Sequence, residues 1–247
     1  MTQTQPRVAL VTGASGTMGG ATARRLVADG YRVILTDVSG ERLKALASEL
    51  GGASYALAAD LSDANAIEHL ATEAERTVGP IDVLVNNAGI LSNHKSADTS
   101  LDEWRKVLAI NLDAAFLLAR RVLPGMKERR FGRIVNVCSL AMKSGGLTAG
   151  TAYTTSKGAV AALTFSLARE AASFGVTVNA ISPAYVKTPM VMEQLTEAQR
   201  KALLAQIPVG RFCEPEEFAH CVAFLVSPLS GFITGEILDL NGGLHFD

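Results

Sequence analysis

The sequence contains few cysteines, no excess of either charge and no long apolar run. Its three cysteines, Cys138, Cys213 and Cys221, are odd in number and form no C-x-x-C pair, which excludes a disulfide framework and a cysteine-based metal site. The net charge of -1, without blocks of like charge, excludes a surface built for nucleic acid or an anionic membrane. The apolar runs are shorter than the ~18 residues that a membrane helix needs, and the N-terminal residues fit no signal peptide. We therefore expect a cytoplasmic protein without a metal centre, a nucleic-acid partner or a membrane contact.

What the sequence does contain is an alternation of short apolar runs and helical patterns over 247 residues, which suits one large α/β domain. Strands are expected at residues 7–11, 32–36, 54–59, 81–85, 134–137, 176–181 and 235–240. Parallel neighbours require crossover connections, so the series predicts a single Rossmann-type, doubly wound parallel sheet of about seven strands with helices on both faces. No linker or repeat divides residues 1–247. Residues 188–210 break the alternation, and we expect them to form a substrate lid.

A glycine-rich loop, residues 13–20, follows the first expected strand and precedes a helical pattern at residues 21–28. A strand, a glycine loop and a helix in this order direct backbone N–H groups and the positive end of the helix toward a phosphate. The glycines let the backbone approach a pyrophosphate closely. A tight turn without a ligand would look the same, so the loop indicates a dinucleotide site but does not establish one alone.

Asp37 ends the second expected strand, 18 positions after Gly19 (37 − 19). An acidic residue about 20 positions after such glycines can accept hydrogen bonds from the adenosine ribose 2′-hydroxyl, and it would repel a 2′-phosphate. No lysine or arginine lies in the glycine loop or directly beside Asp37 to offset this repulsion. The sequence therefore favours NAD over NADP, although an aspartate at this point could also cap a helix.

Tyr153 and Lys157 open a long helical pattern and are four positions apart, so a helix places them one turn apart on the same face. A tyrosine with a pKa of about 10 is a poor base at neutral pH, and a neighbouring ammonium lowers that pKa by favouring the phenolate. Such a tyrosine can take a proton from an alcohol or return one to a ketone. The same spacing also occurs by chance in ordinary helices, so its meaning depends on the other residues.

Taken together and in register, the motifs resemble those of the short-chain dehydrogenase/reductase family, in its one-domain branch, over nearly the whole chain. The resemblance is carried by a glycine loop, an acidic-hydrophobic pair, an Asn-Asn-Ala-Gly run, two single positions, a Y-x-x-x-K pair and a segment that begins with proline. In chain order these are Thr12–Gly19, Asp60-Leu61, Asn86–Gly89, Asn111, Ser139, Tyr153 with Lys157, and Pro183–Thr188.

The resemblance implies catalytic roles for four of these residues. Tyr153 would be the general acid/base, and Lys157 would hold the nicotinamide ribose and lower the pKa of the tyrosine. Ser139 would hydrogen-bond the substrate oxygen. Asn111 would keep a water molecule in a proton relay from Lys157. The implied reaction is hydride transfer between the nicotinamide and a secondary carbinol carbon.

The resemblance also implies a cofactor site for NAD. In it, Asp60-Leu61 would meet the adenine, the Val186 backbone would face the carboxamide, and Thr188 would lie on the nicotinamide side. The full predicted cofactor site comprises Gly13, Ser15, Thr17, Met18, Gly19, Asp37, Asp60, Leu61, Asn87, Gly89, Tyr153, Lys157, Pro183, Val186 and Thr188.

The chain departs from the family pattern at three points. Thr17 stands where the family usually has glycine, with Gly16 one position earlier. Ser139 and Tyr153 are 14 positions apart, one more than expected, which leaves Cys138 as an alternative to Ser139. Ala184 replaces a common glycine, which is tolerable if its φ stays negative.

The substrate is expected to be an apolar small molecule, because the residues near the predicted site are largely apolar. The predicted substrate site comprises Ser139, Met142, Leu147, Tyr153 and Tyr185. Further walls are expected from His94 and from Met190, Met192 and Leu195 in the lid. Our first choice of reaction is the NAD-dependent interconversion of a secondary alcohol, hydrophobic or aryl, and its ketone.

Two alternatives remain open. The segments 195–200 and 206–211 resemble the 3-oxoacyl reductase subgroup, in which two arginines usually meet the acidic acyl carrier protein; Arg130 fits one of these positions, but Phe174 occupies the other. A nucleotide-sensing scaffold on the same fold would need none of the four catalytic residues. The helix after Lys157 is apolar nearly all round, which together with the resemblance predicts a homotetramer.

Overall fold

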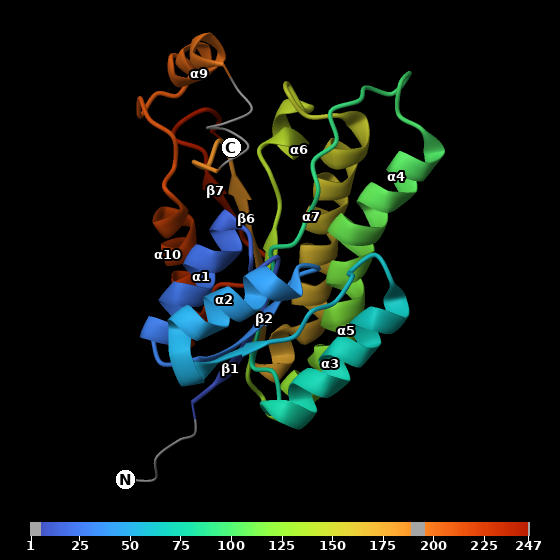
Figure 1. The fold of residues 1–247 in the computed structure, drawn as a ribbon, viewed down its shortest axis with the longest axis vertical. Coiled ribbons are helices and arrows are strands. Elements are labelled where there is room, and N and C mark those ends of the chain that lie inside the picture. Colours follow the sequence, from blue (N-terminus) through green and yellow to red (C-terminus); the bar gives the residue numbers. More distant parts are fainter. Residues whose placement is uncertain (1–5, 189–195, 247) are drawn as a thin grey trace.

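The molecule is built around one parallel sheet of seven strands in the order β3-β2-β1-β4-β5-β6-β7 (Figure 1). The computed structural model describes residues 6–188 and 196–246. The chain order reverses between β1 and β4, and in such open sheets ligands bind at the carboxyl ends of the strands beside this point. The strands are β1 (Val8–Thr12), β2 (Arg32–Thr36), β3 (Ser54–Ala56), β4 (Val83–Asn86), β5 (Gly132–Val137), β6 (Val176–Pro183) and β7 (Ile237–Leu240).

Helices cover both faces of the sheet, as the sequence predicts, with α1, α2 and α10 on one side and α3, α5 and α7 on the other (Figure 1). The alternation along β1 shows why: Leu10 packs with the α3, α5 and α7 side, whereas Val11 packs with the α1, α2 and α10 side. The helices are α1 (Thr17–Ala28), α2 (Gly40–Leu50), α3 (Ala64–Thr77), α4 (Leu101–Leu108), α5 (Ala114–Glu128), α6 (Ala141–Ser144), α7 (Thr151–Ala171), α9 (Glu197–Leu204) and α10 (Pro215–Val226).

The described elements differ from the sequence-based ranges mainly at their ends. Helix α1 begins at Thr17, four residues before the expected start, because the end of the glycine loop, including Gly19 and Gly20, forms its first turn. The two helical stretches around Asn111 form one continuous rod, in which a π-helical turn at Ala109–Asp113 joins α4 to α5. Such turns are frequent at functional sites. None of the described helices combines the length and the apolar character that crossing a membrane requires.

Candidate active site

The glycine loop forms a cradle at the start of α1. A Cβ on Gly19 would lie 2.2 Å from the carbonyl oxygen of Gly13, and Gly13 itself has a φ of +63°, so both positions require glycine. Gly16 is the N-cap of α1; no side chain caps the helix, and its first turn carries no acidic residue. The first N–H groups of α1 are therefore available to an anion. Thr17 is the first helical residue, which explains why this chain needs no glycine there.

Asp37 lies directly beside this cradle. One carboxylate oxygen, Oδ2, accepts hydrogen bonds from the Ser15 N–H (3.2 Å) and the Ser15 hydroxyl (2.6 Å). The other oxygen, Oδ1, accepts one from the Val38 N–H (2.7 Å). The carboxylate is thus fixed at the carboxyl end of β2, next to the loop that would hold a pyrophosphate. A negative charge at this place is compatible with a ribose hydroxyl and repels a phosphate.

Asn87 joins the end of β4 to the glycine loop. Its Nδ2 donates to the carbonyl oxygens of Thr12 (2.9 Å) and Gly13 (3.3 Å). The Thr12 hydroxyl in turn accepts from the N–H groups of Asn87 and Ala88, both at 2.9 Å. The Asn87 Oδ1 is buried and has no partner among the described residues. An orphaned acceptor on the wall of the cleft suits a hydroxyl or amide group of a bound nucleotide.

Helix α7 carries Tyr153 and Lys157 on one face, as their spacing predicts, and Ser139 approaches from the carboxyl end of β5. Ser139 is a hydrogen-bond partner of the Tyr153 hydroxyl. Cys138, the alternative left open by the sequence, is buried, and burial raises the pKa of its thiol to about 11. The segment between Ser139 and Tyr153 contains α6 and two successive glycines, Gly145 and Gly146, which both have a φ of +72°.

Lys157 is buried, and its ammonium donates to the carbonyl oxygen of Val137 at 2.7 Å. Burial lowers the pKa of Lys157 to about 8, because removal from water disfavours the charged form. A Cβ on Gly89 would lie 3.4 Å from the Lys157 Nζ and 3.2 Å from the Asn111 Oδ1. Gly89 therefore keeps open the space next to both polar groups.

Asn111 lies in the π-helical turn and is almost fully buried. Its side chain donates to the carbonyl oxygen of Ile90 (3.1 Å) and to the Ser156 hydroxyl (3.0 Å), and it accepts from the Ile90 N–H (2.8 Å). The Ser156 hydroxyl donates to the Tyr153 carbonyl oxygen (2.7 Å). The side chain thus connects the Ile90 loop to the helix that carries Tyr153, while its proposed part in a proton relay stays a prediction.

The pKa of Tyr153 differs from the expectation. The sequence predicts a pKa lowered by Lys157, whereas burial raises it and the hydrogen bond with Ser139 offsets only part of that rise. The reason is the direction of the Lys157 ammonium, which faces the Val137 carbonyl and lies 5.7 Å from the centroid of the Tyr153 ring. In this arrangement Tyr153 holds its proton at neutral pH.

A cavity of about 400 Å³ opens above these residues. It runs from the cofactor cradle to α9, so it joins the two predicted sites. Its lining includes the predicted residues Met18, Asn87, Gly89, Ser139, Leu147, Tyr153, Lys157, Pro183, Tyr185, Val186 and Thr188. The sequence reasoning missed other lining residues, among them Asn93, Thr148 and Leu203. Leu203 carries no local signal, because only the tertiary position of α9 brings it to the cavity.

Several predicted residues lie elsewhere. Met142 is not part of the cavity lining: it is partly buried and packs against a core cluster that contains Val160, so its predicted substrate contact stays a prediction. His94 does not wall the cavity, because its Nδ1 pairs with the Glu103 carboxylate at 2.8 Å. The Leu61 side chain packs in the core beside α3 and α5, so only its backbone is left for the predicted adenine contact. The predicted lid contacts Met190, Met192 and Leu195 lie outside the described residues.

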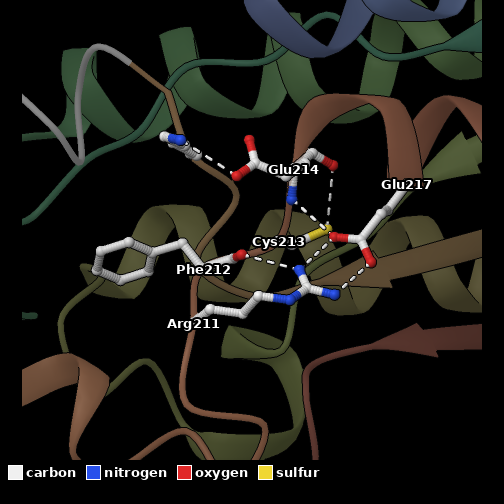
Figure 2. A network of polar contacts seen from close by, with 6 residues as sticks. Arg211, Phe212, Cys213, Glu214 and Glu217 are labelled. Carbon is white, nitrogen blue, oxygen red and sulfur yellow. Dashed lines mark hydrogen bonds and ion pairs between the residues drawn. The ribbon is translucent and has the colours of Figure 1, made fainter.

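The segment that carries Val186 is attached to the start of α10. Cys213 donates its N–H to the Tyr185 carbonyl oxygen (3.2 Å), and its own carbonyl oxygen accepts from the Lys187 N–H (2.8 Å). Because backbone groups of successive residues in a strand point to opposite sides, the Val186 N–H points away from Cys213. Figure 2 shows the polar contacts around Cys213, one of the two residues of this short bridge. Arg211 makes two hydrogen bonds to Glu217 (2.6 and 2.7 Å), which also accepts from the Glu214 N–H (2.9 Å).

Comparison with known proteins agrees with this geometry. A family model described as enoyl-(acyl carrier protein) reductase matches residues 13–245. The chain belongs to the short-chain dehydrogenase/reductase family. The 3-oxoacyl-[acyl-carrier-protein] reductase of Vibrio cholerae is 41% identical over 240 residues, which cover 97% of each chain. The acetoacetyl-CoA reductase of Rhizobium meliloti is 40% identical over 241 residues, which cover 97% of this chain and 99% of the relative.

Among solved structures, a variant of the actinorhodin polyketide ketoreductase with NADPH is similar, with a TM-score of 0.91, 36% identity and coverage of 98% of both chains. These short-chain dehydrogenase/reductase relatives support the alternative prediction, a 3-oxoacyl reductase, better than our first choice of a general secondary alcohol dehydrogenase. The protein is therefore an oxidoreductase of this family with the predicted Rossmann-type fold, and the family implies a nicotinamide cofactor.

Proposed function

We propose that the protein reduces the 3-oxo group of an acyl thioester to a 3-hydroxyl group with a nicotinamide cofactor. The observation that carries this proposal is the Tyr153 hydroxyl, which borders the cavity, has Ser139 as its partner and has a raised pKa. A tyrosine that keeps its proton at neutral pH is in the form that donates to a ketone oxygen. The names of the relatives, which are reductases, support the same direction.

The residues around the cleft fit a dinucleotide, because the cradle at Gly13 and Gly19, the uncapped start of α1 and the orphaned Asn87 Oδ1 all lie at the switch point of the sheet. When bound, the nicotinamide supplies the hydride.

The side chains handle the substrate oxygen and its proton. Ser139 donates a hydrogen bond to the carbonyl oxygen and so stabilises the charge that develops on it. Tyr153 transfers its phenolic proton to that oxygen. The Lys157 ammonium lies 5.7 Å from the centroid of the Tyr153 ring, and it stabilises the phenolate that this transfer leaves behind once it turns from the Val137 carbonyl.

The cofactor we propose is NADH rather than NADPH. The fixed carboxylate of Asp37 and the absence of a basic side chain in the glycine loop support this choice. The related polyketide ketoreductase structure holds NADPH, so the choice must be made on residues of this chain. A direct comparison of initial rates with the two reduced cofactors tests it.

The reaction itself is tested by steady-state assays of the purified protein with acetoacetyl-CoA and, separately, with 1-arylethanols and oxidised cofactor. We expect a kcat/KM for the thioester that is at least about tenfold higher, since a protonated tyrosine serves reduction. A clear preference for the arylethanols would instead support the second candidate, a hydrophobic secondary alcohol dehydrogenase. The apolar side chains of Ile90, Leu140, Leu147 and Leu203 on the cavity wall favour that candidate.

We further propose that the protein is a cytoplasmic homotetramer. Large apolar side chains are exposed on α5 (Phe116), on α7 (Phe165) and beyond the end of α10 (Leu229 and Phe232). Exposed apolar surface on two separate faces suits two kinds of subunit contact. Light scattering at micromolar concentration should give a mass about four times that of the chain, and a stable monomer would contradict the proposal.

A further inference from the structure

The contacts of the Lys95 side chain are not explained by the proposed reaction or by the proposed cofactor site. Its ammonium donates to the carbonyl oxygen of Gly146 at 2.6 Å and to that of Ala149 at 2.7 Å. No carboxylate in the described part of the chain forms an ion pair with it. Both acceptors belong to the loop between α6 and α7, and both Gly146 and Ala149 line the cavity.

The two carbonyl groups need this cation. They point at one position, where their negative ends would otherwise face each other, and both residues are buried from water. A buried carbonyl without a donor is costly, and a charged donor makes the stronger kind of hydrogen bond. The loop is also tight at this point: a Cβ on Gly146 would lie 2.9 Å from the Ala149 oxygen and 2.2 Å from the Thr154 hydroxyl oxygen on α7. The ammonium therefore sets the shape of the loop.

The segment on which Lys95 lies is itself fixed. The carbonyl oxygens of Ser92 and His94 accept from the N–H groups of Gly150 (2.6 Å) and Thr151 (3.0 Å). The side chains of Ser92 and His94 both bond the carboxylate of Glu103 at the start of α4. Lys95 thus connects the hydrogen-bonded segment of Ser92 and His94 to the loop that contains Leu147. Leu147 lies on the cavity wall and is 73% exposed.

We propose that Lys95 is a positioning residue that holds the Gly146–Ala149 wall and thereby sets the length of acyl chain that the cavity admits. This deepens the proposed function and rests on it for the substrate. Without the ammonium, the wall would open and Leu147 would no longer limit the cavity. Short substrates would lose a packing surface, and longer ones would gain space.

The first experiment needs no turnover. Hydrogen exchange is compared in the wild type, Lys95→Met, which keeps the chain length but removes the donors, Lys95→Arg, which restores them, and Lys44→Met, an exposed lysine on α2 as control. Exchange at the amides of Gly150 and Thr151 should be about tenfold faster in Lys95→Met, as loss of a charged hydrogen bond implies. It should be unchanged in Lys44→Met and close to wild type in Lys95→Arg. Unchanged exchange in Lys95→Met overturns the proposal.

The second experiment measures kcat and KM for acetoacetyl-CoA and 3-oxododecanoyl-CoA. In Lys95→Met, the ratio of kcat/KM for the long to the short substrate should rise about tenfold. Most of the change should be in KM, because the displaced Gly146–Ala149 wall lies away from the reacting atoms and alters how the acyl chain binds. Leu147→Ala should shift the ratio the same way, and the double variant should shift it by less than the product of the two single effects, since both act on one wall. Faster exchange with an unchanged ratio would make Lys95 merely structural and overturn the proposal. If the wild type reduces neither thioester, the proposed function fails, and the exchange result alone decides whether Lys95 holds the wall.

Discussion

The proposed preference for NADH over NADPH rests on the Asp37 carboxylate, and the variant Asp37→Asn isolates its charge. Asn keeps the size of the side chain, and its oxygen can still accept a hydrogen bond from Ser15 or Val38. Two unit charges 4 Å apart repel by about 1 kcal/mol in water and by about 4 kcal/mol at the effective dielectric constant of a protein surface. Because 1.4 kcal/mol corresponds to a factor of ten, these energies correspond to a preference of about 5- to 700-fold, and we expect the wild type to prefer NADH by a value inside that range, about 10- to 100-fold.

In Asp37→Asn we expect kcat/KM for NADPH to rise about 10- to 100-fold, and that for NADH to fall only a fewfold, since one acceptor for the ribose hydroxyl remains. Adding Val38→Arg, at a position 73% exposed, should raise the NADPH value further by supplying a cation. The assay is the initial rate of acetoacetyl-CoA reduction with each cofactor. Glu41→Gln, an exposed acidic residue at the start of α2, removes the same charge nearby and serves as control. A wild type that prefers NADPH, or a ratio that Asp37→Asn leaves unchanged, would refute the reasoning.

Two further variants test the cradle and the buried lysine. Gly19→Ala places a methyl group 2.2 Å from the Gly13 carbonyl oxygen and should weaken NADH binding at least about tenfold in a fluorescence titration, whereas Gly52→Ala, with no atom within 4 Å of its Cβ, should leave binding unchanged. Equal binding by both variants would contradict the cradle. Burial depresses the pKa of Lys157 from 10.5 to about 8, so the unfolded chain binds more protons between these values and stability rises with pH across that window. Below pH 8 the buried charge of Lys157 costs about 3 kcal/mol of stability, and Lys157→Met removes this cost. The variant also loses the hydrogen bond to Val137, worth about 1 kcal/mol, so its free energy of unfolding at pH 7 should be about 2 kcal/mol higher than that of the wild type. Efficient reduction should be abolished. The gain should fade between pH 8 and 10.5 in urea titrations, and a pH-independent difference would contradict the assigned pKa.

The sheet could be predicted because its strands are buried on both faces and therefore appear as continuous apolar runs. Arg32–Thr36 is found with the predicted bounds for this reason. The start of α1 could not be predicted, since its first turn contains Gly19 and Gly20, which have low helix propensity, and the close approach of the Gly13 carbonyl requires a glycine at position 19.

Within the site, the sequence indicates which residues meet but not how each is oriented or solvated. The helical spacing of Tyr153 and Lys157 predicts their shared face, whereas the sign of the tyrosine pKa shift depends on burial, which no local pattern contains. Met142 has the right chemistry for a substrate contact, but in the structure it packs against a core cluster and does not line the cavity. Lys95 was missed because its acceptors are backbone carbonyls about 50 residues away, which leave no side-chain motif.

The most direct test of the account is the rate of acetoacetyl-CoA reduction by Tyr153→Phe, measured together with the dissociation constant for NADH. Loss of the phenolic proton donor should lower kcat by about 10²–10⁴-fold, as expected for a general acid. NADH affinity should change less than about threefold, because one hydrogen bond from the Tyr153 hydroxyl contributes little to the binding of NADH. A Tyr153→Phe variant that reduces the thioester at a rate near that of the wild type would contradict the central claim.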